Sequence, residues 1–540
     1  MSAMFHLENF GGIDLYRPRR ENELLWSARA AAQMRSLFAA GEYTDANTIN
    51  AVLKSQFQFY AAQLEKVIPQ LASLQYMAFL LHQYDQASLI DETIEGLGEP
   101  KRAQWRELER VFRRTAKFLC ETMTLLQPGE APDLATGDLV ALTDEAWIAA
   151  EEMVKLYLAS DQTFCVFPQD TVLEIHPEGQ GHFDLRINRD CPFQTVSGRD
   201  FAHRGRFVGQ QSAAYDYLHA EHDKHLGPPL RQAIGLTYEE TVNLLRDIVE
   251  SCRGGRGFGI PFVPRRRVVD VWSNALGKPA ATVDKVLAGF ALRKADMEKE
   301  GREIYKPKQE YRAFRRALFE ILHSSGDHLF FSKRMAVENR EQLIGGACFK
   351  QFPPQWRSPE VDKALEALSN AAGDWFEAVV ERNLANIGIR GLRSVHRVGQ
   401  GSAGIVVPPD VGEIDFLGYS RSQRLLVLVE CKMVRYSFEG KLYRDDLQEF
   451  VTGTKSYLSR FLKKVEWVRA NVKPICAALD SSGLPGGQVS PSRLAAAMIT
   501  YYPNIAQFFI DECPCVSLTN FMLDFEEAGG WPYLKGVTEL

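Results

Sequence analysis

Apolar residues recur every three or four positions through the first 160 residues, which is the spacing of one face of an α-helix. Few prolines interrupt this pattern. It predicts a mostly helical domain over residues 1–160, and the clearest helices are expected at 21–40, 45–67, 70–84, 101–126 and 143–159. Because no catalytic motif stands out in this segment, we expect it to have a structural or partner-binding role.

The period shortens to two between residues 163 and 188, where three short runs rich in β-forming residues lie between proline- and glycine-rich turns. The runs are 163–167, 171–175 and 182–188, and they predict a small β-containing insertion over residues 161–235. The same segment carries His219, His222 and His225 at three-residue spacing. Three imidazoles can hold a transition metal, but steps of three drift around a helix by about 60°. An exposed polar helix is therefore favoured over a metal site.

Residues 236–352 are predicted to form a helical, basic region with helices at 282–292 and 310–323. A glycine-rich stretch at 253–259 lacks the Gly-Lys-Ser/Thr ending of a phosphate-binding loop, which argues against nucleotide binding. The run Arg265, Arg266 and Arg267 follows it, and arginine clusters contact phosphates well. These three residues are candidate nucleic-acid contacts, and a solvated linker is the alternative. Closely spaced prolines at 353, 354 and 359 then predict the principal domain boundary.

Helical and β-type runs alternate over residues 353–540. A helix is expected at 361–384, strands at 412–417 and 425–432, a helix at 445–470, and strands at 492–502 and 508–516. The whole chain is thus expected to be an α+β multidomain protein. Its N-terminal region is mostly helical with a small β insertion, and its C-terminal domain is α/β.

The two strands at 412–417 and 425–432 carry the candidate chemistry. If the turn between them closes at residues 421–424, Asp415 lies opposite Glu430, about 5 Å away at Cβ, and Lys432 emerges on the same face. Mg²⁺ prefers carboxylate oxygens and bridges to phosphates, while a nearby lysine stabilises the transition state. This pattern predicts a Mg²⁺- or Mn²⁺-dependent site for phosphodiester hydrolysis. Asp415, Glu430 and the carbonyl of Cys431 are the expected metal ligands, and Glu377 on the preceding helix is an additional one.

In their order along the chain, these residues resemble the PD-(D/E)XK nuclease superfamily, which has the restriction-endonuclease-like fold. The matching residues are Glu377 in a leading helix, Asp415 in Gly-Glu-Ile-Asp, and Glu430-Cys-Lys at the end of a hydrophobic strand. The likeness covers about residues 359–525, and Ile414 replaces the proline of the family's motif.

The resemblance implies a Mg²⁺-dependent endonuclease that acts on DNA, with RNA as the alternative substrate. By analogy, it also implies a prokaryotic restriction or anti-phage effector whose N-terminal region senses a target or partner. Since one such site cuts one strand, double-strand cutting implies a homo-oligomer or a partner protein. The rival interpretation is a catalytically inactive nucleic-acid-binding or scaffold protein on the same fold.

Composition restricts where nucleic acid would bind. The net charge is −6, so any attraction to phosphates must be local. A basic helix face formed by Lys455, Arg460, Lys463 and Lys464 is one candidate, and a solvated helix surface is its alternative. Nine scattered cysteines indicate reduced thiols, and no signal peptide or long apolar run is visible. We therefore expect a cytoplasmic location without membrane association.

Overall fold

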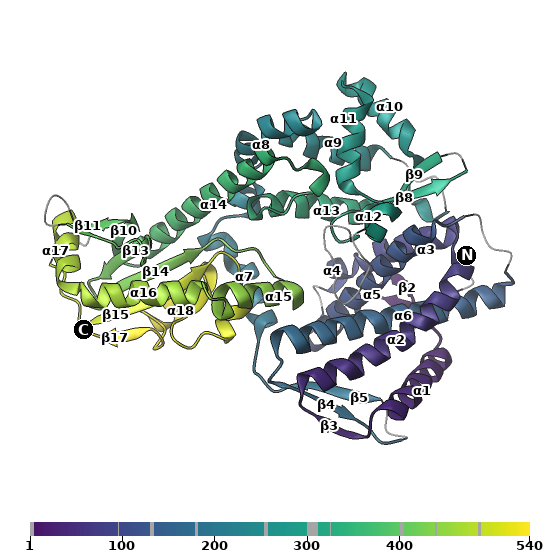
Figure 1. Ribbon diagram of the computed structural model, residues 1–540, viewed down its shortest axis with the longest axis horizontal. Helices are drawn as coiled ribbons and strands as arrows, with labels where there is room; N and C mark the ends of the chain where they lie inside the picture. Colours follow the sequence, from purple (N-terminus) through teal and green to yellow (C-terminus); the bar gives the residue numbers. More distant parts are fainter. Residues whose placement is uncertain are drawn as a thin grey trace. The chain divides into compact units, whose positions relative to one another are not determined.

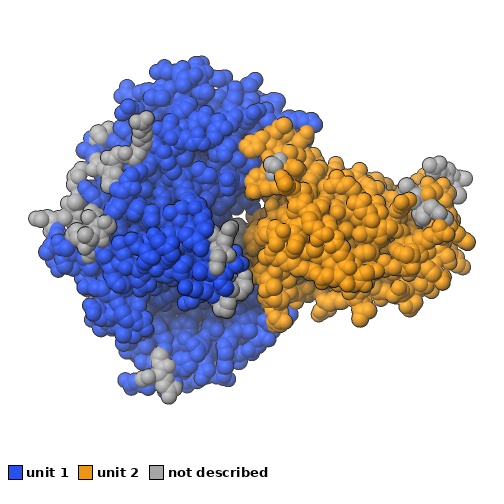
Figure 2. All heavy atoms as spheres, turned by 180° about the vertical axis from the view of Figure 1, so that it is seen from behind, with its two compact units in different colours: residues 1–189, 223–345, 351–364 blue, residues 190–222, 346–350, 365–540 orange. Residues whose placement is uncertain are grey.

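The chain divides into two compact units, each assembled from separated parts of the sequence (Figure 2). Unit 1 comprises residues 1–189, 223–345 and 351–364, and unit 2 comprises residues 190–222, 346–350 and 365–540. The computed structural model describes residues 5–94, 97–129, 134–178, 182–252, 257–299, 312–324, 326–399, 404–437, 440–483 and 488–540. This division differs from the four predicted segments of 1–160, 161–235, 236–352 and 353–540. The chain passes between the units five times rather than running through successive domains.

Helices dominate the first part of unit 1, as the apolar spacing predicts (Figure 1). A hairpin of β1 (Leu7–Phe10) and β2 (Ile13–Tyr16) precedes them. The helices are α1 (Arg20–Leu37), α2 (Ala46–Leu71), α3 (Leu74–Ala87), α4 (Ile90–Thr93), α5 (Glu99–Leu126) and α6 (Thr136–Asp161). The start of α2 is fixed by Asp45, whose carboxylate accepts a hydrogen bond of 2.8 Å from the Thr48 N–H.

The predicted β insertion is real but smaller than expected. Strands β4 (Thr171–Ile175) and β5 (Phe183–Ile187) confirm two of the three predicted runs. They form an antiparallel sheet with β3 (Gly41–Tyr43), which comes from the loop between α1 and α2. The strand predicted at 163–167 is wrong, because Gln162–Val166 continues α6 as a turn of π-helix. Here helical hydrogen bonding overrides the local preference of β-branched and aromatic residues.

The rest of unit 1 is not purely helical. Its helices are the C-terminal part of α8 (His219–Ile234), α9 (Tyr238–Ser251), α10 (Arg265–Leu276), α11 (Ala280–Phe290), α12 (Lys294–Lys299) and α13 (Lys333–Gly346). A four-stranded sheet of order β6-β9-β8-β7 accompanies them, built from β6 (Phe262–Pro264), β7 (Ala291–Leu292), β8 (Leu318–His323) and β9 (Gly326–Phe330). The helix predicted at 310–323 is therefore wrong: residues 312–317 form turns and irregular backbone, 318–323 form β8, and the first two residues lie outside the described residues.

Unit 2 is a mixed α/β structure around one six-stranded sheet of order β10-β13-β14-β15-β16, with β17 also paired to β15 (Figure 1). The strands are β10 (Ile389–Val395), β13 (Ile414–Ser420), β14 (Leu425–Lys432), β15 (Arg493–Thr500), β16 (Cys515–Ser517) and β17 (Val537–Glu539). The first three are antiparallel neighbours, whereas β15 runs parallel to β14. A separate two-stranded ribbon consists of β11 (Arg397–Val398) and β12 (Ile405–Val406).

Five helices and a sixth from the middle of the chain complete unit 2. They are α14 (Pro359–Asn386), whose residues from 365 onward belong to it, α15 (Gly440–Leu447), α16 (Tyr457–Ala470), α17 (Val472–Ser482), α18 (Leu518–Ala528) and α7 (Phe193–Phe207). The helix predicted at 445–470 is interrupted by a π-helical turn at Gln448–Thr452 and by Gly453. The strand predicted at 508–516 begins only at Cys515, because Phe508 ends a short 3₁₀ helix (Ile505–Phe508) and residues 509–514 form turns, bends and irregular backbone.

One face of the sheet is covered by α14, α18 and α7. Phe376 and Val380 of α14, Phe521 of α18 and Phe207 of α7 join the same apolar cluster as Val429 of β14. Strand β14 is also buried on its other face, which explains why its sequence is almost continuously apolar and does not alternate with polar residues.

An ionic and aromatic cluster holds α7 to the sheet. Arg204 of α7 donates a 2.6 Å hydrogen bond to the carbonyl of Tyr501, just after β15, and its guanidinium lies 4.1 and 4.0 Å from the ring centroids of Tyr501 and Tyr502. It also pairs with Asp200 at 3.3 Å. The hydroxyls of both tyrosines donate to the carboxylate of Asp216, at 2.7 and 2.9 Å. Residues 190–222 are therefore an integral part of unit 2.

In the described parts of both units, every helix is too short or too polar to cross a lipid bilayer.

Candidate active site

The strand pairing places two carboxylates side by side at one end of the unit 2 sheet. Phe416 pairs with Val429, and the antiparallel ladder continues to Ser420 opposite Leu425. This is the predicted register, and extending it by one position sets Asp415 opposite Glu430. Both carboxylates are buried, with only 8 % of Asp415 and 4 % of Glu430 exposed. Buried carboxylates require cations or hydrogen-bond donors around them.

Lys432 supplies one cation to both carboxylates. Its Nζ lies 2.7 Å from Glu430 Oε1 and 3.5 Å from Asp415 Oδ2. The backbone N–H of Cys431 adds a 2.7 Å hydrogen bond to Asp415 Oδ2. The ring of Tyr457, the first residue of α16, lies 5.1 Å from the same ammonium. The structure thus brings Asp415, Glu430 and Lys432 together as the sequence predicts.

The net electrostatic effect keeps Lys432 protonated. Burial lowers the pKa of its ammonium, but Glu430 and then Asp415 raise it by more, so the pKa ends above its ordinary value. At neutral pH Lys432 is therefore a cation and a hydrogen-bond donor, and it is not a proton acceptor. The buried thiol of Cys431 has a raised pKa, chiefly because of burial, so that side chain stays neutral as well.

A second lysine enters the site from α16. Lys464 Nζ lies 2.5 Å from Glu430 Oε2 and 3.4 Å from Asp415 Oδ1. The residue is buried, with 6 % of it exposed. The prediction that Lys464 belongs to an exposed basic face is therefore wrong. It occupies the inward stripe of α16 together with Phe461 and Val468, at the three- and four-residue spacing of one helix face.

Glu377 of α14 lies near this cluster. Its carboxylate accepts a 3.1 Å hydrogen bond from Ser394 Oγ at the end of β10. Burial raises the pKa of Glu377 to about 7, and the negative charge of Asp415 is the next largest cause. The effect of Asp415 shows that the two carboxylates are close enough to interact. Among the described residues no three His, Cys, Asp or Glu side chains converge as a metal group, so Glu377 as a direct ligand stays a prediction.

The raised pKa of Glu377 predicts a pH-dependent stability without added metal. The unfolded chain releases this proton near pH 4.5 and the folded chain only near pH 7, so the folded state binds more protons between them. The contribution to stability is therefore greatest below pH 4.5 and falls as the pH rises to about 7. We expect Glu377→Gln to flatten this fall, measured as the thermal midpoint in EDTA across this range.

Glu381→Gln is the matched control, since Glu381 lies one helical turn further along α14 and pairs with Arg393 at 3.5 Å. This variant should keep the wild-type pH profile. Identical profiles for Glu377→Gln and wild type would remove Glu377 from the titrating groups of the site.

The donor chemistry of the site fits a hard divalent cation. Asp415 and Glu430 each present carboxylate oxygens to the same two ammonium groups, so one cation can contact both carboxylates. Carboxylate oxygens are the ligands that Mg²⁺ and Mn²⁺ prefer. Asp415 and Glu430 would hold such an ion, and the carbonyl of Cys431 and the carboxylate of Glu377 remain predicted additions.

The other predicted nucleic-acid contacts fall into two groups. Lys455, Arg460 and Lys463 are exposed on or just before α16, so their side chains are accessible to phosphates. Arg265 is not, because it is buried at the start of α10 and its guanidinium pairs with Asp284 and Glu320. The prediction is therefore wrong for Arg265. Its neighbours Arg266 and Arg267 are exposed on α10 in unit 1 and remain candidates.

The expectation of an exposed polar helix at the histidine triplet is wrong for His222. This residue is fully buried, and its Nε2 lies 3.0 Å from the carbonyl of Tyr215, to which a ring N–H donates. His222 therefore contributes to the packing of α8.

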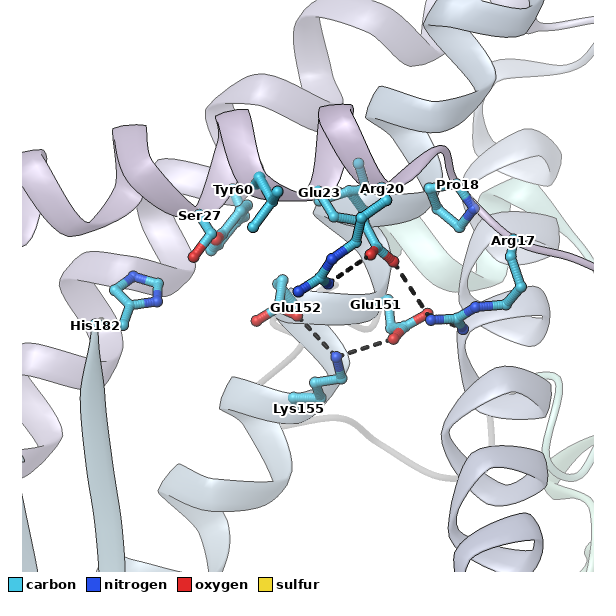
Figure 3. Close-up of a pocket in the computed structure, with 12 residues that line it drawn as sticks. Arg17, Pro18, Arg20, Glu23, Ser27, Tyr60, Glu151, Glu152, Lys155 and His182 are labelled. Atoms are coloured by element: carbon cyan, nitrogen blue, oxygen red, sulfur yellow. Dashed lines mark hydrogen bonds and ion pairs between the residues drawn. The ribbon is translucent and has the colours of Figure 1, made fainter. Parts of the chain in front are cut away.

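Unit 1 contains a polar cavity of about 380 Å³ between α1, α2 and α6 (Figure 3). Its charged lining residues pair with one another: Arg17 with Glu151 at 3.2 Å, and Lys155 with Glu152 at 2.8 Å. Arg20 also pairs with Glu23, at 3.0 Å. The described lining therefore holds as many cations as carboxylates, and it offers no excess of one charge to select an ionic ligand.

Comparisons of the chain with protein-family models, with curated proteins and with solved structures found no match.

Proposed function

We propose that unit 2 is a metal-dependent nuclease domain that hydrolyses phosphodiester bonds, with DNA as the expected substrate. The supporting observation is the buried group of Asp415, Glu430 and Lys432 at the end of β14. Two carboxylates can hold one divalent ion, and a protonated lysine lies beside them. These positive charges would stabilise the negative charge of a phosphoryl transition state. The resemblance to the PD-(D/E)XK superfamily rests on the same residues.

Each residue has a distinct role in this proposal. Asp415 and Glu430 hold the divalent ion, which when bound lowers the pKa of water and withdraws charge from the phosphate. Lys432 stabilises negative charge that develops on the attacked phosphate, since its raised pKa keeps it cationic. Glu377, with a pKa of about 7, is suited to accept the proton of the attacking water near neutral pH.

The rival function is a nucleic-acid-binding or scaffold protein that has lost turnover. All the carboxylates and the lysine of the site are in place, which favours the enzyme. An RNA-directed nuclease would use the same residues, so the choice of substrate is the first object of the test. By analogy alone, we extend the proposal to a restriction or anti-phage effector in which unit 1 senses the target or a partner.

The test is to incubate the full chain with plasmid, linear duplex and single-stranded DNA and with RNA, in Mg²⁺, in Mn²⁺ and in EDTA. We expect cleavage of DNA that requires a divalent ion. Tight binding without cleavage of any substrate would support the scaffold protein instead.

Lys432→Ala should lower the cleavage rate by about 10²–10³-fold, as removal of one preorganised donor does, while nucleic-acid affinity changes little. The fold should persist because Lys464 still contacts both carboxylates. Single-turnover rates and binding isotherms separate the two effects. Lys473→Ala, at an exposed lysine of α17, is the control and should cleave at the wild-type rate.

A further inference from the structure

All four carboxylate oxygens of the proposed metal site have a donor from the protein itself. Lys464 contacts Glu430 Oε2 and Asp415 Oδ1, whereas Lys432 contacts Glu430 Oε1 and Asp415 Oδ2. The N–H of Cys431 also donates to Asp415 Oδ2. A divalent ion that binds both carboxylates therefore competes with an ammonium group for their oxygens.

The charges of this group cancel. Two carboxylates face two ammonium groups, so the four side chains have no net charge, and all four lie in a largely buried environment. Adding a divalent ion creates a strong excess of positive charge where screening by water is weak. A phosphodiester brings one negative charge to the same place, and departure of one ammonium group from the carboxylates removes the remaining positive charge.

The two lysines differ in what holds them. Lys432 is two residues from Glu430 on β14 and lies over the ring of Tyr457, which favours its cation. Lys464 reaches the site from α16, and its ammonium is held by Glu430 and Asp415. Because these contacts are with the oxygens that a divalent ion would occupy, the ion competes directly with Lys464, whereas Lys432 has the Tyr457 ring as a further partner.

We infer that Lys464 is an internal competitor of the metal, which makes metal binding at Asp415 and Glu430 depend on the arrival of a nucleic-acid phosphate. Lys464 holds both carboxylates in place when the site carries no divalent ion and releases them when ion and substrate bind together. It is a positioning residue that suppresses metal loading in the absence of substrate. This inference rests on the proposed function of the site.

The test measures Mn²⁺ binding to the full chain by electron paramagnetic resonance, without nucleic acid, for wild type and Lys464→Met. Loss of one ammonium leaves the site with a net negative charge, so we expect Mn²⁺ affinity to rise by at least about tenfold. Lys473→Met, at an exposed lysine of α17, should leave the affinity unchanged. Affinity in Lys464→Met that is equal to or weaker than wild type would overturn the inference.

A second readout follows from thermodynamic reciprocity. Mn²⁺ should strengthen the binding of a hydrolysis-resistant phosphorothioate oligonucleotide to the wild type by about tenfold or more, and this coupling should shrink to a few fold in Lys464→Met. Equal coupling in both proteins would contradict the inference.

Removing a buried cation can also impair folding, so Lys464→Gln, whose amide can still donate to Glu430, is tested in parallel. If both variants lose structure in EDTA, Mn²⁺ must restore it, because the freed carboxylates would then take the ion. Failure to restore it counts against the inference. Failure of the proposed function looks different, since wild type would then neither cleave nucleic acid nor bind Mn²⁺ even when nucleic acid is present.

Discussion

Replacing Asp415 with asparagine will lower the rate of nucleic-acid cleavage by at least about 10³-fold, the largest loss we expect from any single substitution in the site. The amide oxygen still accepts the hydrogen bond that the Cys431 N–H gives to Asp415 Oδ2, so the local backbone is retained. The variant loses the negative charge and one oxygen ligand of the proposed metal. In EDTA its affinity for nucleic acid, which then depends on exposed cations, should change by no more than a few fold.

The control is Asp410→Asn, which makes the same chemical change at an exposed aspartate in the loop before β13. Single-turnover cleavage by this variant should match wild type. Circular dichroism spectra of wild type and both variants should be the same, which checks that the substitutions do not unfold the protein. Efficient cleavage by Asp415→Asn would move the catalytic centre away from β13 and β14.

Replacing Arg204 with methionine will destabilise unit 2 by about 3–5 kcal/mol, as expected when one partner of a buried ion pair is removed. Its guanidinium contacts the rings of Tyr501 and Tyr502 and donates a hydrogen bond to the Tyr501 carbonyl. It also pairs with Asp200, so the substitution leaves this buried carboxylate without its cation. Hydrogen exchange detected by mass spectrometry should show faster exchange in α7 and in β15 together.

Arg206→Met is the matched control on the same helix. Arg206 is half exposed and pairs with Glu526 at 2.9 Å on the surface, a contact worth about 0–1 kcal/mol. Exchange in β15 should therefore stay close to wild type in this variant. If the two substitutions have equal effects, the cluster around Arg204 does not bind α7 to the sheet.

The centre of the candidate site was predictable because strand geometry is regular. A side-chain period of two and a short turn fix which residues face each other, so the spacing of Asp415 and Glu430 along the chain determined their pairing. The predicted helix at 361–384 and strand at 492–502 are also confirmed, because long runs are the strongest local signals in a sequence.

The burial of Lys464 was not predicted. A lysine on a helix is usually solvated, so Lys464 was assigned to an exposed basic face. In the structure Lys464 is buried with Phe461 and Val468. The spacing of 461, 464 and 468 is that of one helix face. Burial of Lys464 could still not be predicted, because only the carboxylates opposite it make burial of a lysine favourable.

The assignment of α7 could not come from local pattern at all. Its buried face carries Ser197, Asp200 and Arg204 between Phe193 and Phe207, so no apolar stripe marked the helix, and its partners lie about 300 residues later in α18 and just after β15. Strand β8 was missed for a related reason: Phe319 and Ile321 are buried by pairing with neighbours that a short apolar run does not identify.

The five passages of the chain between the units have a consequence for biosynthesis. Residues 190–222 leave the ribosome long before α18 and β15, which complete their packing. At typical rates of translation the delay is on the order of 15–60 s. During that time the buried face of α7, which includes Phe193, Asp200 and Arg204, has not yet met these partners. The proposed nuclease activity is therefore expected only after β15 and α18 have been synthesised, because the sheet that carries Asp415 and Glu430 is incomplete until then.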